Sequence, residues 1–229
     1  MSSLVRRAPW APVLLLAIAA ACSSPLDKPP VEQRFYTLDA PRPEAAAAPA
    51  DAPVLAVRRF RASPGYEGRE LVFATGDGAF RTDFYNVFFA PPAAMIGDEA
   101  REWLDRSGLF RAAVASTSQA DPHHALEGSL TAIHGDRAAG RHRAVLEVQF
   151  LLIDTRAANT PILFQRQYRR ERPVADGTAA ALAGGLNAAL AEILGELEGD
   201  LAPVVRRPAP APAQAPPAVR PSGGRAARR

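Results

Sequence analysis

The chain has a single cysteine, Cys22, so it can form no internal disulfide and its fold must be held together by burial alone. Cys22 stands at the end of a short apolar run, Trp10 to Ala21, which follows Arg6 and Arg7. Such a run is too short to cross a hydrocarbon core of roughly 30 Å. Residues 1–21 are therefore predicted to be a signal peptide that is removed.

Two processing routes are compatible with Cys22. Ala19-Ala20-Ala21 satisfies the small-residue rule for ordinary cleavage, which would leave a free terminal thiol, and the same position suits a lipid-modified cysteine. We expect acylation of Cys22, with palmitate among the acyl chains, because a free terminal thiol would oxidise outside the cytoplasm. Ser23 follows rather than Asp, which in bacterial lipoproteins favours the outer membrane, with the protein on its periplasmic face.

The formal net charge of +3 is not shared evenly along the chain, because the part between the signal peptide and the C-terminal tail is acidic. The signal peptide and the C-terminal tail hold eight arginines and no acid, so the rest carries a net charge of about −5. This is not the basic footprint of a nucleic-acid-binding protein. No nucleic-acid partner is predicted.

The chain divides into four segments. After the signal peptide, residues 22–32 are predicted to be a polar, Pro-containing lipidated tether. Residues 33–202 are long enough for one domain with one core. Residues 203–229 hold Ala, Pro and Arg without periodicity and are predicted to be a disordered tail.

Alternating apolar and polar residues predict most of the strands. The clearest pair covers residues 126–132 and 144–152, which residues 135–141 would join as a hairpin, and residues 161–168 would continue the meander. Residues 70–75 and 79–84 flank Gly76-Asp77-Gly78, a typical turn. Residues 34–38 and 54–60 are predicted to be two further strands, with an Ala/Pro linker over residues 40–53 between them.

Helical spacing predicts two helices. The first covers about 92–107, after Pro91-Pro92 and before the stop signal Ser107-Gly108. The second covers about 176–201, with Asp176 as the N-cap. Its apolar stripe holds Leu182, Leu186, Leu190, Ile193, Leu197 and Leu201. Gly184-Gly185 interrupts this helix and indicates either close packing or a frayed first turn.

Four sequence segments stand out in this order along the chain: Phe35-Tyr36-Thr37-Leu38-Asp39-Ala40-Pro41, Tyr85-Asn86-Val87-Phe88-Phe89-Ala90-Pro91-Pro92, Leu126-Glu127-Gly128-Ser129-Leu130 and Leu186-Asn187-Ala188-Ala189-Leu190. With them the chain resembles the ABC-type transport auxiliary lipoprotein family. The resemblance covers roughly residues 33–201. It implies an α/β fold, which with the hairpins above we expect to be a mixed, largely antiparallel twisted sheet with two main helices packed against it.

The resemblance also implies a non-catalytic function. Such lipoproteins accompany a permease, an ATPase and a substrate-binding MCE-domain protein in moving lipids or other hydrophobic molecules between two membranes. The chain itself holds no P-loop and no G-x-S-x-G nucleophile motif. No catalytic residue and no cofactor is therefore predicted.

The histidines are candidate ligands for a metal ion. His124 and His134 would share a strand face and His142 would begin the next strand, with Asp121 and His123 nearby. A structural zinc site needs four ligands at tetrahedral distances, whereas these residues fall at strand ends where exposed polar residues are common. No metal site is predicted.

Aromatic residues are dense between residues 80 and 89. Phe84, Tyr85, Phe88 and Phe89 are candidate contact residues, because alternation places only about half of such a run on one face of a strand. Phe88 and Phe89 should lie on opposite faces, one in the core and one available for contact. The occupant is left open between a transport partner, another copy of the subunit and the lipid itself, as is the alternative that the segment is only core.

The sequence thus predicts an outer-membrane lipoprotein that acts as an auxiliary subunit of an ABC/MCE-type transport system. The alternative is a lipoprotein that stabilises the envelope or activates cell-wall synthesis, which the arginines of the tail would suit by binding anionic polymers. A third alternative, an envelope hydrolase, lacks a nucleophile motif.

Overall fold

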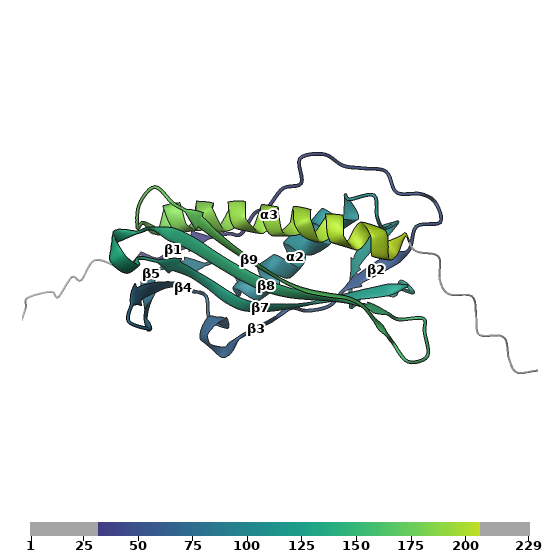
Figure 1. Ribbon diagram of the computed structural model, residues 1–229, viewed down its shortest axis with the longest axis horizontal. Coiled ribbons are helices and arrows are strands. Elements are labelled where there is room, and N and C mark those ends of the chain that lie inside the picture. Colours follow the sequence, from purple (N-terminus) through teal and green to yellow (C-terminus); the bar gives the residue numbers. More distant parts are fainter. Residues whose placement is uncertain (1–31, 207–229) are drawn as a thin grey trace, which may run out of the picture.

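The structure is a computed structural model and describes residues 32–206 (Figure 1). The strands are β1 (Arg34–Tyr36), β2 (Val54–Val57), β3 (Arg61–Ala62), β4 (Glu70–Gly76), β5 (Ala79–Phe88), β6 (Ala112–Ala115), β7 (His124–Asp136), β8 (Arg143–Asp154) and β9 (Ile162–Pro173). The helices are α2 (Pro92–Asp105), α3 (Ala179–Val205) and the short η1 (Pro64–Tyr66) and η2 (Ala138–Gly140). The signal peptide, Cys22 and nearly all of the tether and tail lie outside the described residues.

The antiparallel meander β7–β8–β9 forms one side of the sheet, as the alternating pattern predicts, and β7 joins it to the other strands (Figure 1). Alternate residues of β8, from Ala144 to Leu152, are fully buried against the helices. Gly128 in β7 has a steric role, because a Cβ there would overlap the ring of Phe60. The strand pair therefore needs both the predicted alternation and a glycine where another side chain crosses it.

The sheet is less antiparallel than predicted. The second edge of β7 is shared by three short strands, β2, β3 and β4, all running parallel to it, and β1–β5 and β2–β6 are also parallel pairs. Only β4–β5, β7–β8 and β8–β9 are antiparallel. The predicted strand over residues 54–60 is also two strands, β2 and β3. Parallel partners are joined by long connections, which leave no turn signal in the sequence.

Helix α3 carries the predicted apolar stripe, and all six predicted stripe residues are buried. Thr178, not Asp176, is its N-cap, because the Thr178 hydroxyl accepts a hydrogen bond from the backbone of Ala181. Asp176 instead accepts hydrogen bonds from Thr178, whose orientation it fixes. The helix also runs four residues beyond its predicted end, past Pro203. It is long and apolar enough to cross a membrane, yet half of its apolar window is buried in the domain, as expected of a core helix.

Gly185 has a packing role in α3. A Cβ on Gly185 would lie 2.5 Å from Val174 and 2.8 Å from Ala144, whereas a Cβ on Gly184 would meet nothing within 4 Å. Of the two interpretations of Gly184-Gly185, close packing therefore holds for Gly185.

An acidic stripe on α3 is paired with arginines of β9. Arg166 binds Glu196 at 2.8 Å and Asp200 at 2.6 Å, Arg172 binds Glu192 at 2.7 Å, and Arg170 binds both glutamates. Between these arginines, the buried Tyr168 donates its hydroxyl proton to Asp200 at 2.6 Å. We call Arg166, Arg170 and Arg172 the arginine edge. It fastens the last strand to the last helix.

The first part of the Ala/Pro linker is fixed to both helices. Leu38 and Ala40 are buried, the Asp39 amide donates to Asn187 of α3, and the Ala40 amide donates to Glu99 of α2. Two residues on, Arg42 forms a bidentate pair with Glu198 at 3.0 Å. Residues 38–42 thus hold the chain that follows β1 to the body of the domain, and we call them the clasp.

Candidate contact surface

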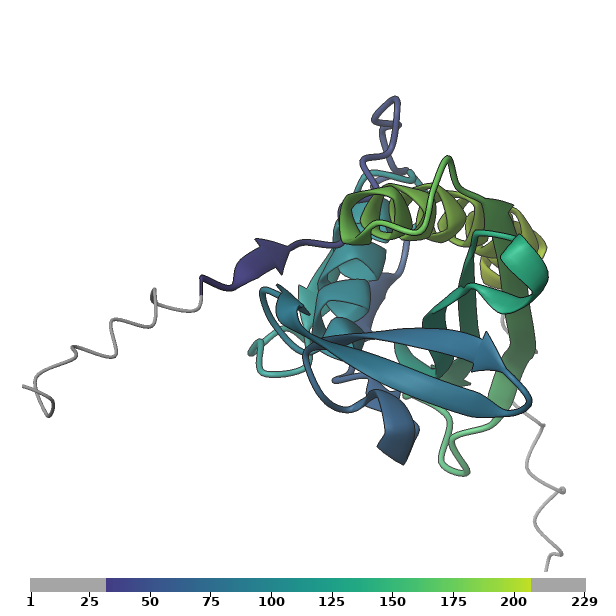
Figure 2. The ribbon, with the colours of Figure 1, turned by 90° about the vertical axis from the view of Figure 1, so that its left-hand side faces the viewer.

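The sheet edge formed by β1 and β5 carries most of the exposed aromatic side chains. Figure 2 shows β1 as the purple arrow, on the side of the domain where the described chain begins. β1 runs parallel to the end of β5, with Arg34 opposite Asn86 and Tyr36 opposite Phe88. The partner of β5 on its other side is β4, and the ladder between them is interrupted where residues 84–86 bulge out. The short strand and the bulge together bring side chains that are about 50 residues apart to one edge.

The four predicted contact residues divide into one core residue and three exposed ones. Phe88 is 1% exposed, whereas Phe84, Tyr85 and Phe89 are 65%, 56% and 66% exposed. Phe88 and Phe89 lie on opposite faces, as predicted, so Phe88 cannot be reached by a partner and is removed from the candidate site. A contact role for the other three stays a prediction.

A fourth exposed aromatic residue, Phe35 of β1, joins this surface. Its ring meets the ring of Phe89 edge to face at a centroid distance of 6.4 Å, and Phe84 meets Tyr85 in the same way at 5.5 Å. Phe35 was not among the predicted site residues, because only the parallel pairing of β1 with β5 brings it there. We call Phe35, Phe84, Tyr85 and Phe89 the aromatic edge.

The bulge is held by hydrogen bonds from within. The Asp83 carboxylate accepts hydrogen bonds from the backbone amides of Tyr85 and Asn86, at 2.9 and 3.0 Å, and from the Asn86 side chain. The Gln33 side chain donates to the Phe84 carbonyl at 2.9 Å. The Phe89 amide donates to the Tyr36 carbonyl at 2.8 Å. The backbone that carries the aromatic rings is therefore fixed before any partner arrives.

Phe80 belongs to a different neighbourhood. It follows the turn Gly76-Asp77-Gly78, all three residues of which have positive φ, as the predicted turn requires. Its ring packs edge to face on His134, 5.4 Å between centroids, and His134 in turn stacks on Tyr66. Phe80 thus covers the outer face of the sheet and is not part of the aromatic edge.

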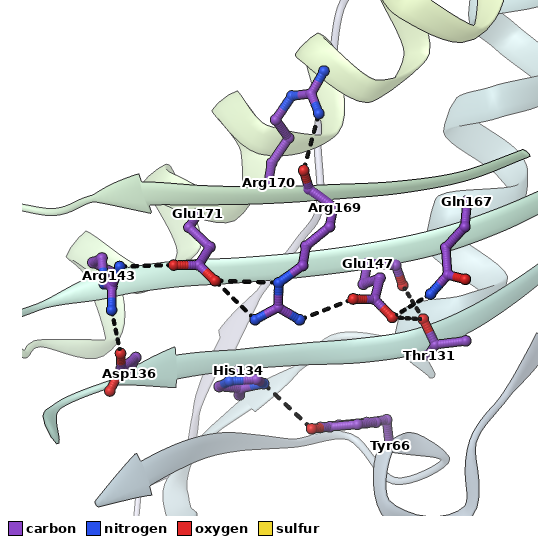
Figure 3. A network of polar contacts seen from close by, with 10 residues as sticks. All are labelled: Tyr66, Thr131, His134, Asp136, Arg143, Glu147, Gln167, Arg169, Arg170 and Glu171. Carbon is purple, nitrogen blue, oxygen red and sulfur yellow. Dashed lines mark hydrogen bonds and ion pairs between the residues drawn. The ribbon is translucent and has the colours of Figure 1, made fainter. Parts of the chain in front are cut away.

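Beside His134, the outer face of β7, β8 and β9 holds a continuous chain of ion pairs (Figure 3). Arg143 lies between Asp136 and Glu171, at 3.0 and 2.7 Å, and Arg169 lies between Glu171 and Glu147, at 2.8 and 2.9 Å. The hydrogen bonds from Arg169 lower the pKa of both glutamates, and the Ala138 amide lowers the pKa of Asp136. These carboxylates are ionised and already paired, so they are poorly suited to proton transfer.

The histidines differ in their hydrogen-bond partners. His123 accepts a hydrogen bond from the Val54 amide at 3.1 Å, and the Tyr66 hydroxyl lies 3.3 Å from the His134 ring nitrogen. Burial lowers the pKa of His123, His124 and His134, which keeps them neutral. Over residues 32–206 no three His, Asp or Glu side chains come close enough to hold a metal ion.

Two hollows could admit a small molecule. One of about 270 Å³ lies beside α2 and is lined by Arg58, Arg59, Arg101 and Asp98 among others. The other, of about 470 Å³, lies between the linker and the C-terminal ends of both helices. Both are open to solvent and neither has the apolar lining of a buried lipid site. The aromatic edge is therefore the stronger candidate site.

Together the fold and this site define an α/β domain whose most distinctive exposed feature is the aromatic edge. Its sequence places it in a known group: the model of the ABC-type transport auxiliary lipoprotein component matches residues 36–197, and the chain belongs to that family. The predicted family is thus confirmed. No curated protein is detectably similar in sequence.

Solved structures share the fold at low sequence identity. A protein from Xanthomonas campestris is 18% identical, with a TM-score of 0.65 over 75% of this chain and 95% of that chain. An uncharacterised protein is 14% identical, with a TM-score of 0.58 over 74% of this chain and 99% of that chain. The predicted α/β class is confirmed as a curled mixed sheet with two helices on it. The similarity says nothing about the ligands or partners of this chain.

Proposed function

We propose that the protein is a periplasm-facing lipoprotein of the outer membrane and a non-catalytic auxiliary subunit of an ABC/MCE-type system that moves lipids or other hydrophobic molecules between the inner and outer membranes. Its family is that of an ABC-type transport auxiliary lipoprotein component. The observation that carries the proposal is the aromatic edge, which lies at the start of the domain, next to the tether that leads to Cys22.

A binding role suits the chemistry of the described domain. The carboxylates of the outer face are engaged with arginines, and those of α3 with the arginine edge. Four exposed aromatic rings on a preformed backbone are typical of a contact surface, since they bury large area with little loss of side-chain freedom. Energy for transport would come from a partner ATPase, since this sequence has no P-loop.

The shape of the domain supports a bridging position. The described chain starts at β1 at one end of the long axis and finishes at the end of α3 at the other (Figure 1). With acylated Cys22 in the outer membrane, the far end would face the periplasm, where the MCE-domain protein and, beyond it, the permease and ATPase would be met.

Isolation of the tagged protein from detergent-solubilised envelopes tests this function. We expect an acylated Cys22 by mass spectrometry, fractionation with the outer membrane, and co-purification of an MCE-domain protein. A Cys22→Ser variant is the control and should leave the membrane fraction. An unmodified Cys22 would contradict the lipid anchor of the proposal. Recovery of cell-wall synthases in place of an MCE-domain protein would contradict the transport role and favour the envelope-stabilising alternative.

A further inference from the structure

The occupant of the aromatic edge follows from its position, chemistry and backbone. We propose that the aromatic edge lies against the membrane leaflet that holds the lipid anchor, with its rings between phospholipid headgroups and the upper part of the acyl chains. The domain is then held at the membrane in one orientation by two attachments, the acyl chains and the edge. This deepens the proposed function and rests on its acylated Cys22.

The first argument is reach. Cys22 and Gln33 are eleven residues apart, so the tether spans at most roughly 36–40 Å, and a flexible chain of that length averages roughly 17–20 Å. Helix α3, with 27 residues, is roughly 40 Å long and runs along the long axis of the domain (Figure 1). The aromatic edge is therefore the end of the domain that the anchor keeps at high effective concentration near the leaflet.

The second argument is the chemistry of the side chains. The four rings are each more than half exposed, and they form two edge-to-face pairs, Phe35 with Phe89 and Phe84 with Tyr85. Tyrosine collects at membrane–water interfaces, and phenylalanine is among the residues that interfacial segments bury in the boundary between headgroups and acyl chains. A group of exposed apolar side chains on a domain also marks a contact surface. A tyrosine among three phenylalanines suits a position between the headgroups and the upper acyl chains, because the tyrosine hydroxyl can stay with the polar headgroups.

The third argument is the backbone. A segment that enters a region of low dielectric must have its polar backbone groups paired. In the bulge, the Tyr85 and Asn86 amides donate to Asp83, the Phe84 carbonyl accepts from Gln33, and the Phe89 amide donates to Tyr36. The aromatic edge can therefore lose water without leaving these groups unpaired.

A leaflet suits this edge better than a second copy of the chain does. Sheet-to-sheet association needs a long free strand, and β1 has only three residues. Backbone pairing of two copies through β1 would therefore form few hydrogen bonds.

Tryptophan fluorescence of the full, lipidated protein tests the orientation. After removal of the predicted signal peptide, Trp103 is the only tryptophan, and it is buried in α2. The Phe89→Trp variant, reconstituted in vesicles of phosphatidylethanolamine and phosphatidylglycerol, should show blue-shifted emission that brominated phospholipids quench. The parent protein should show no quenching, because Trp103 lies inside the domain.

The matched control is Ile162→Trp. Ile162 is 58% exposed and begins β9 at the opposite end of the sheet, so its tryptophan should not be quenched. Equal quenching of the two variants, or none of Phe89→Trp, would overturn the inference. Emission of Phe89→Trp that shifts with protein concentration but not with brominated lipid would also overturn it, and would assign the edge to a second copy.

A second measurement separates this inference from the proposed function. In the acyl-free Cys22→Ser protein, the changes Phe84→Ser and Phe89→Ser together should lower the vesicle partition coefficient about tenfold, which corresponds to about 1.4 kcal/mol. The same two changes in the lipidated protein should leave co-purification with the MCE-domain protein in detergent unchanged. Unchanged partition with lost co-purification would refute leaflet contact and leave the proposed function standing. Quenching of Phe89→Trp by brominated lipid without co-purification of an MCE-domain protein would support leaflet contact and contradict the proposed function.

Discussion

The two ends of the sheet described above expose different edges. At one end β1 offers three residues and a group of aromatic rings, whereas β9 is an edge strand of twelve residues that carries arginines paired with α3. A long free edge invites pairing with another chain, and charged residues are a common protection against it. The long edge is therefore protected by its paired arginines, whereas the short edge can expose a group of aromatic rings.

The largest effect on stability should distinguish the buried Phe88 from its exposed neighbour Phe89. Phe88→Ala should lower the free energy of unfolding by about 3–5 kcal/mol, because the side chain is fully buried. Phe89→Ala should leave it within about 0.5 kcal/mol, as for other exposed positions. Chemical denaturation of both variants measures this. Equal losses of stability would show that Phe89 is also part of the core and that no aromatic edge exists.

The arginine edge should depend on the hydroxyl beneath it. Tyr168→Phe removes the hydrogen bond to Asp200, and burial raises the pKa of Tyr168, so the hydroxyl is neutral at any working pH. A hydrogen bond to a charged group contributes about 1.5–3 kcal/mol, and we expect a loss in that range in denaturant titrations. Tyr85→Phe, at the aromatic edge, is the control and should have no effect. A neutral result for Tyr168→Phe would mean that the Tyr168 hydroxyl does not stabilise the contact between β9 and α3, which would then rest on packing and on the ion pairs of the arginine edge.

Acid should weaken the β8–β9 side more than the aromatic edge. Bonds from Arg169 hold the pKa of Glu147 and Glu171 below their ordinary value of 4.5, so their stabilisation is complete above that pH and is lost as the pH falls through the lowered values. Arg169→Met should therefore flatten the dependence of the melting temperature on pH below about 4.5. Arg81→Met serves as control, since Arg81 has no ion pair within residues 32–206. An unchanged acid dependence in Arg169→Met would contradict this account.

The smallest effect is expected at the far end from the aromatic edge. The tail predicted to be disordered begins at residue 203, but residues 203–205 belong to α3. Truncation after Arg206 removes the rest of that predicted tail, residues 207–229, and thermal unfolding should stay nearly unchanged. Removal of residues 34–36 should in contrast uncover the buried Phe88, which pairs with Tyr36, and lower the melting temperature. A loss of cooperative unfolding in the truncated protein would show that the tail is part of the domain.

Local patterns in the sequence predict the elements of the fold that depend on residues close together in the chain. Alternation predicts β7, β8 and β9, the Gly-rich turn predicts the β4–β5 hairpin, and the apolar stripe predicts α3. Alternation also places Phe88 and Phe89 on opposite faces. These features follow from the period of the backbone and so need no knowledge of the tertiary structure.

The features that the sequence did not predict depend mostly on contacts between residues that are far apart in the chain. Phe35 joins the site only because β1 pairs with β5 in parallel, across about 50 residues. The predicted N-cap of α3, Asp176, was wrong because Asp176 and Thr178 are both good capping residues. In the structure the Thr178 hydroxyl is the group that accepts from the helix backbone. Likewise β2 and β3 are too short to show a period, so their parallel pairing with β7 had no signal.

The clasp has a mechanical consequence. A lipoprotein anchored in one membrane and bound to a partner that reaches another is pulled through its tether, and the pull enters the domain at β1. The three-residue pairing of β1 with β5 should give way first, and the strain then meets residues 38–42, where two buried side chains and bonds to both helices hold the chain. We expect such a molecule to lengthen by one strand under tension and still keep its core folded.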